Sequence, residues 1–61
     1  MAREYLWTAD AAEMLGVSET VARKLFDDGK IEGFKIPESG YRRFSRESVE
    51  RVRDEMRRER G

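Results

Sequence analysis

Glycine and proline divide this chain into short segments, and their spacing limits the fold more than any other sequence feature. The breaks fall at Gly16, Gly29, Gly33, Pro37 and Gly40. Glycine readily takes the left-handed conformation that ends a helix, and Pro/Gly/Ser clusters mark turns. The segments between the breaks predict a helix, a second helix, a hairpin and a last helix. The expected fold class is therefore mainly α with a small β-hairpin.

The first two segments predict a helix-turn-helix unit. Thr8 is expected to cap a helix over about 8–15, and Gly16 is expected to end it. Ser18 is expected to cap the next helix, over about 18–28. Only Val17 separates the stop from the next start, so the turn is tight. The expected core-facing residues are Ala11, Ala12 and Leu15 in the first helix and Ala22, Leu25 and Phe26 in the second.

Residues 33–44 predict a hairpin of the kind called a wing. Aromatic and β-branched residues flank the turn 37–40 on both sides, with strands over 33–36 and 41–44. Side chains alternate along a strand, so Arg42 and Phe44 should point one way and Tyr41 and Arg43 the other. Phe44 is expected to enter the core. A lone hairpin is marginal in water, so one face should pack on the helices.

The last segment predicts a helix over about 45–57, capped by Ser45. Its apolar stripe is narrow, and its other faces should form i, i+4 ion pairs between Glu47 and Arg51 and between Asp54 and Arg58. Residues 57–61 have no apolar anchor and are expected to fray. The stripe consists of Val49, Val52 and Met56. Residues 1–61 are expected to form a single domain.

The composition makes several classes of function improbable. The 61 residues include no cysteine and no histidine, which excludes a zinc finger, a disulfide frame, a thiol nucleophile and an imidazole base. So short a chain offers little room for a water-excluding pocket. We therefore expect no enzyme, metal, cofactor or small-molecule ligand. No stretch is apolar enough to span a membrane, so we expect no membrane partner and a cytoplasmic location.

The formal net charge of zero conceals an asymmetry. Residues 1–34 contain four basic and seven acidic side chains, whereas residues 35–61 contain nine basic and six acidic ones. The positive excess is sharpest from Lys35 to Arg46, where only Glu38 opposes four basic residues. A basic patch on a balanced protein indicates a localised anionic partner.

Two sets of residues are candidates for contacting DNA. The outward face of the second helix could read base edges, although it could also be an ordinary solvated face with three acids that repel phosphates. Glu19 could instead read cytosine, or an acidic residue there could orient a neighbouring arginine. The wing could lie along phosphates or enter the minor groove, or it could be an edge strand kept soluble by charge. The helix set is Ser18, Glu19, Thr20, Arg23 and Lys24; the wing set is Lys35, Ser39, Tyr41, Arg42, Arg43 and Arg46.

Trp7 and Tyr5 precede the first helix and could form a stacking platform. A domain of this size needs large apolar side chains in its core. We therefore expect Trp7 to cover the core.

The motifs resemble those of the MerR-like and excisionase-type winged helix-turn-helix proteins. The opening helix and turn, and the wing followed by Val49, carry the resemblance, which spans about residues 6–52. It implies a MerR-like order of helix, turn, helix, wing and helix. It also implies that Arg23 and Lys24 enter the major groove and that Tyr41 and Arg42 touch backbone or minor groove. The two matching stretches are Thr8-Ala9-Asp10-Ala11-Ala12-Glu13-Met14-Leu15-Gly16-Val17-Ser18 and Gly40-Tyr41-Arg42-Arg43-Phe44-Ser45.

The resemblance favours a phage or plasmid excisionase, a recombination directionality factor. Such a protein would bind adjacent sites on double-stranded DNA cooperatively, bend the DNA and steer an integrase. The opposite charges of the two halves could supply head-to-tail self-association. MerR regulators continue into a dimerisation helix and an effector domain, so their ligand sensing is not carried over. The alternatives are a standalone MerR-like transcriptional regulator, the DNA-binding piece of a longer regulator, and, from another class, a protein-interaction module.

Overall fold

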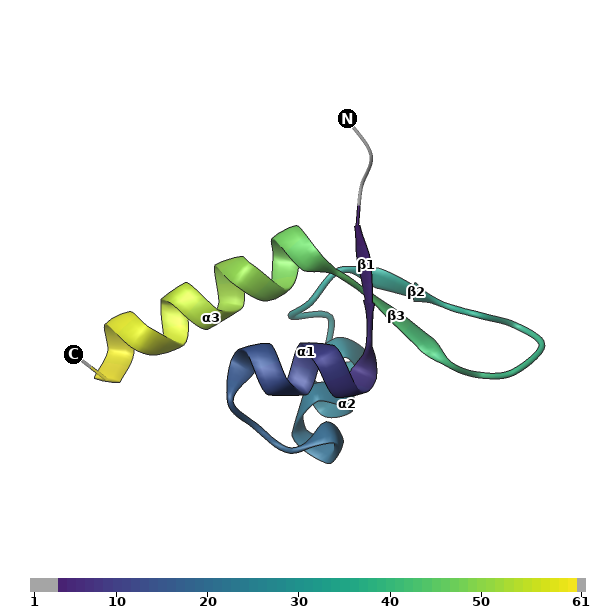
Figure 1. Ribbon diagram of the computed structural model, residues 1–61, viewed down its shortest axis with the longest axis horizontal. Coiled ribbons are helices and arrows are strands. Elements are labelled where there is room, and N and C mark those ends of the chain that lie inside the picture. Colours follow the sequence, from purple (N-terminus) through teal and green to yellow (C-terminus); the bar gives the residue numbers. More distant parts are fainter. Residues whose placement is uncertain (1–3, 61) are drawn as a thin grey trace.

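The computed structural model describes residues 4–60, which form three helices and a small antiparallel sheet (Figure 1). Helices α1 and α2 lie together below the sheet, and α3 extends to the side opposite the wing (Figure 1). None of the described helices is long and apolar enough to cross a membrane. The elements in chain order are β1 (Tyr5–Trp7), α1 (Thr8–Leu15), α2 (Glu19–Asp27), β2 (Gly33–Lys35), β3 (Arg42–Ser45) and α3 (Arg46–Arg60).

The turn between α1 and α2 has the predicted caps. Gly16 takes the left-handed conformation with φ 74°, and its N–H donates to the carbonyl of Ala12 at 2.9 Å. Ser18 is the N-cap of α2, and its Oγ accepts a hydrogen bond from the Val21 N–H at 3.2 Å. The predicted cap at Thr8 is wrong, because β1 runs directly into α1 and places Trp7 at the N-cap position. The Trp7 side chain makes no capping hydrogen bond.

The sheet has one strand more than the predicted hairpin. β3 is its central strand, paired with β2 on one side and with the unpredicted β1 on the other. Leu6 lies opposite Phe44, so β1 pairs with a strand almost forty residues further along the chain. The first residue of β2 is Gly33. A Cβ at this position would lie 2.9 Å from the Phe26 ring and closer still to the Arg43 carbonyl oxygen. Only glycine allows this close approach of β2 to β3.

The core lies between the sheet and the helices. Phe44 and Val49 are fully buried, and the Phe44 ring lies 5.1 Å from that of Phe26. The prediction that Phe44 enters the core is confirmed. The three predicted core positions of α1 are buried and those of α2 are buried or partly buried, as expected; Ile31, which was not predicted, completes the buried set.

Helix α3 is longer than predicted and has different ion pairs. The Ser48 N–H donates to Ser45 Oγ at 3.3 Å, which confirms the cap. The helix continues to Arg60, beyond the predicted end at residue 57, and its last turns consist of good helix formers. The expected fraying of residues 57–61 stays a prediction, and Gly61 lies outside the described residues. Its ion pairs in the described part of the chain join Arg46 to Glu50 and Arg53 to Asp54, not the i, i+4 partners predicted above.

Candidate nucleic-acid interface

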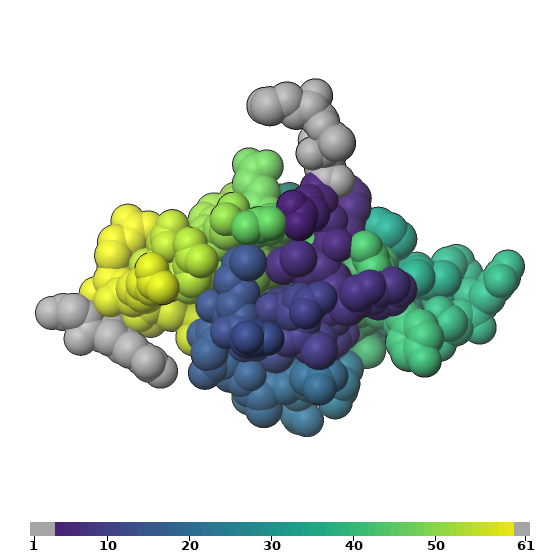
Figure 2. Space-filling model, in the orientation of Figure 1, coloured from purple at the N-terminus to yellow at the C-terminus, as the bar shows by residue number. Residues whose placement is uncertain are grey.

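The wing and the second helix lie on the same side of the molecule. A surface groove of about 270 Å³ separates them and is lined by Glu19 and Arg23 from α2 and by Tyr41 and Arg42 from the wing. The start of α1 closes one side of the groove through Trp7, Thr8 and Ala9. Figure 2 shows the wing projecting beside the surface that α1 and α2 form. Residues of both elements therefore face one groove.

The predicted helix residues lie at the exposed N-terminal half of α2. Thr20 accepts a hydrogen bond from an Arg23 Nη at 3.4 Å, and Glu19 lies 4.0 Å from the same guanidinium. These two neighbours orient the Arg23 guanidinium. Because the side chain is 41% exposed, a ligand can still contact it. Lys24 is exposed and makes no ion pair with any described residue. Ser18 is exposed, and its Oγ accepts the capping hydrogen bond from Val21.

Arg42 connects the wing to α2. Its Nε and one Nη donate to the two carboxylate oxygens of Asp27, both at 3.0 Å. The hydrogen bond from Arg42 and its positive charge hold the pKa of the Asp27 carboxyl below its ordinary value. Asp27 is thus an acidic residue of α2 that orients a neighbouring arginine. The sequence allowed for such a residue but did not identify Arg42 as its partner.

Arg43 points to the opposite face of the wing, as the strand alternation predicted. Its guanidinium carbon lies 3.9 Å from the centroid of the Trp7 ring, and one Nη donates to the Tyr5 carbonyl at 2.8 Å. Arg43 therefore places one Nη donor and a cation–π contact within the fold, on the outer face of the sheet.

Trp7 does not cover the core. It is 47% exposed, and its ring packs edge-to-face against Tyr41 with the centroids 6.1 Å apart. The prediction of a core staple is wrong because Leu6, on the opposite side of β1, faces the core instead. Since neighbouring strand residues face opposite sides, burying Leu6 exposes Trp7. Tyr41 is 65% exposed beside it.

The sequence profile of the helix-turn-helix domain family matches residues 5–57. The chain belongs to the helix-turn-helix domain family. No curated protein and no solved structure gives a significant match to it. Together with the three helices and the small antiparallel sheet, membership supports a small DNA-binding protein with the architecture of a winged helix-turn-helix. Double-stranded DNA is the partner that this family membership suggests.

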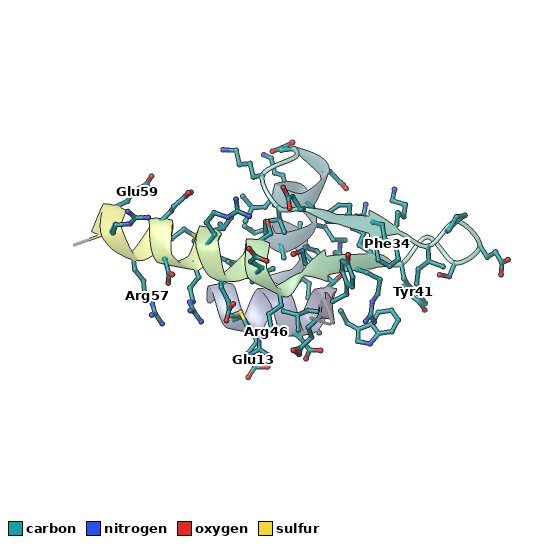
Figure 3. The ribbon with its side chains drawn as sticks, turned by 90° about the horizontal axis from the view of Figure 1, so that it is seen from above. Glu13, Phe34, Tyr41, Arg46, Arg57 and Glu59 are labelled. Carbon is teal, nitrogen blue, oxygen red and sulfur yellow. The ribbon has the colours of Figure 1, made fainter. Side chains whose placement is uncertain are left out.

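The remaining wing candidates of this helix-turn-helix protein lie apart from the groove. Lys35 is exposed at the end of β2 and makes no ion pair within the described chain. Ser39 shapes the turn, because its Oγ accepts a hydrogen bond from the Tyr41 N–H at 3.3 Å. In Figure 3, Phe34 and Tyr41 mark the wing end of the molecule, whereas Arg46 lies at the start of α3.

Arg46 is not part of the wing. One of its Nη atoms donates to both carboxylate oxygens of Glu4 at 2.9 Å, and its Nε lies 3.7 Å from Glu50. The hydrogen bond and charge of Glu4 and the charge of Glu50 raise the pKa of the Arg46 guanidinium, which stays protonated and paired with these two carboxylates. The predicted helix over about 45–57 already contained Arg46, and its inclusion in the wing set is wrong because the change from strand to helix falls between Ser45 and Arg46. The structure leaves Arg46 outside the groove of the helix-turn-helix domain.

Proposed function

We propose that the protein binds double-stranded DNA sequence-specifically, with α2 in the major groove and the wing on the backbone or in the adjacent minor groove. The observation that carries this proposal is the bidentate pair between Arg42 of the wing and Asp27 of α2. It fixes the wing relative to the helix, so both elements address one duplex. A binding role suits a surface with a shallow groove better than a catalytic one.

The charges near the groove suggest a division of work. Arg23 and Lys24 stand on the helix that would face base edges, and an arginine there can pair bidentately with guanine. Lys35, Tyr41 and Arg42 stand on the wing, where phosphate contacts would set the register. Arg42 would exchange part of its pairing with Asp27 for a phosphate. Arg43 and Arg46 would act within the fold.

We further propose a MerR-like excisionase of phage or plasmid origin that acts on DNA in the bacterial cytoplasm. Support comes from the resemblance of the wing stretch 40–45 and of the first helix to that group. In this role, neighbouring copies would bind adjacent sites cooperatively and bend the DNA to steer an integrase. The acidic first half and the basic second half, which contains α3, would supply head-to-tail contacts between copies.

A mobility shift combined with footprinting tests the proposal. The DNA flanking the protein's own gene is the probe, and a random-sequence duplex of equal length is the control. Neutralising about four to six phosphates gives a log–log salt slope of roughly −4 to −5. Protection of phased repeats, tighter binding to two sites than to one, and a bent duplex support the excisionase role. A single independent site supports a regulator instead, and no shift on any duplex contradicts DNA binding.

A further inference from the structure

The Trp7 ring contributes neither a helix cap nor core packing to the fold. It occupies the N-cap position of α1, where Ser, Thr, Asp and Asn are favoured because their side chains satisfy free helix amides. The indole makes no such bond. It is also 47% exposed, so much of its apolar surface stays in water. Neither capping nor core packing accounts for a tryptophan at this position.

The surroundings of Trp7 hold the ring in one orientation at the mouth of the groove. The guanidinium of Arg43 covers it at 3.9 Å, and that guanidinium is itself anchored to the Tyr5 carbonyl at 2.8 Å. Tyr41 packs against the indole edge-to-face. An exposed side chain fixed by two neighbours loses little further conformational entropy when a ligand contacts it.

The groove that Trp7 lines is the same one that α2 and the wing border. Arg23 and Arg42 contribute positive charge to its walls, and the free amides at the start of α1 lie beside Trp7. Trp7 and Tyr41 each add an apolar ring with one polar hydrogen, from the indole Nε1–H and the phenol O–H. Rings with such a polar end suit a sugar–phosphate strand, since the ring can pack on deoxyribose while the hydrogen reaches a phosphate oxygen.

We infer that Trp7 and Tyr41 form an aromatic clamp on the sugar–phosphate backbone of one DNA strand, with Arg43 as the positioning residue that holds the indole. The inference rests on the proposed DNA binding and adds contact residues to it. Because the contact is to the backbone, it strengthens binding to all duplex sequences alike. Because Trp7 is uncharged, its removal leaves the number of neutralised phosphates unchanged.

The intrinsic fluorescence of the full chain tests the clamp directly. Trp7 is the only tryptophan in the sequence, so every change in indole emission reports on this site. The probe is a random-sequence duplex of about two helical turns. Addition of the duplex is expected to change the emission in parallel with the mobility shift. Emission that stays constant while the shift shows binding overturns the clamp and leaves the proposed function intact.

Substitution separates a DNA contact from a structural role. Trp7→Thr gains a favoured capping residue at the N-cap and loses the ring contacts with Arg43 and Tyr41, so the two effects oppose each other and the melting temperature should change little. Affinity for the random duplex should fall about tenfold, as expected for losing a hydrogen bond to a charged group. The log–log salt slope should not change, whereas Arg42→Gln should make it shallower by about 0.9. Trp7→Phe, which keeps a ring without the N–H, should fall between wild type and Trp7→Thr.

Phe34→Thr is the matched control, because Phe34 is 48% exposed on the same sheet but does not line the groove. It should leave affinity unchanged. Equal losses from Trp7→Thr and Phe34→Thr, or a fall in melting temperature that accounts for the lost affinity of Trp7→Thr, overturn the clamp. If wild type fails to shift any duplex, the proposed function fails and the clamp fails with it.

Discussion

Arg42 of the wing and Asp27 at the end of α2 share two hydrogen bonds of 3.0 Å each. The pair links the wing to the helix, and it also places a carboxylate next to an arginine that is proposed to contact a phosphate. The same contact therefore orients the proposed DNA-binding surface and reduces its positive charge.

Replacing Asp27 with Asn should strengthen binding to random-sequence duplex. The substitution keeps one acceptor oxygen that can hold the wing, releases one Arg42 donor and removes a negative charge beside the phosphates, which should raise affinity about three- to tenfold at low salt. Affinity is measured by fluorescence anisotropy of a labelled duplex. Asp28→Asn is the control, because it removes the same charge from an exposed neighbour that makes no ion pair among residues 4–60. Equal gains from both variants would show that the pair itself plays no part.

Replacing Arg23 with Ala should reduce discrimination between target and random DNA. If its guanidinium reads a base, the target site should lose about 1–3 kcal/mol of binding free energy while random duplex loses much less. Competition binding with both duplexes measures the difference. Lys30→Ala, beyond the end of α2, removes a charge without touching the reading face and should affect both duplexes alike. A uniform loss from Arg23→Ala would reassign this residue to phosphate binding.

The two phenylalanines of the wing strands should differ sharply in their effect on stability. Phe44 is fully buried, and Phe44→Ala should cost about 3–5 kcal/mol of unfolding free energy, a large part of what so small a domain has. Phe34 is half-exposed and packs against Tyr5 with centroids 5.0 Å apart, so Phe34→Ala should cost about 1 kcal/mol. Urea denaturation followed by circular dichroism compares the two. Similar costs would contradict the assignment of the core.

The ion pair at Asp27 should respond to acid in a defined direction. Arg42 lowers the pKa of the folded carboxyl below its ordinary value of 3.8, so the folded state holds fewer protons than the unfolded state near that pH. The stabilisation by the pair is present above 3.8 and is lost as the pH falls through the lowered pKa. NMR titration of the Asp27 carboxyl measures the shift. Arg42→Gln should return the pKa towards 3.8, and an unchanged pKa in that variant would exclude Arg42 as its cause.

Local signals were sufficient to predict the helices, the turn between α1 and α2, and the wing. Gly16 ends α1 and Ser18 caps α2 through hydrogen bonds to residues only three or four positions away. The alternation of side chains along the strand places Phe44 in the core. β1 was missed because three residues are too few to show alternation and because its partner lies almost forty positions away. The exposed position of Trp7 follows from β1. Because β1 was not predicted, Trp7 was wrongly expected to cover the core.

The candidate site was predictable in outline but not in its pairings. The sequence separates Arg42 from Arg43 by strand alternation, but only the folded chain shows that Asp27 meets the first and Trp7 the second. Such contacts depend on how α2 and β1 sit against β3, which local propensity does not determine.

The direct passage of β3 into α3 has a mechanical consequence. Strand and helix meet at Ser45 and Arg46 with no connecting residue, and the Arg46 side chain is tied to Glu4 and Glu50 at that junction. DNA that binds the wing would therefore also determine the orientation of the 15-residue helix α3, which is about 22 Å long, relative to the DNA axis. An extra residue at the junction would rotate α3 by about 100° about its axis, so that its charged faces would point in a different direction.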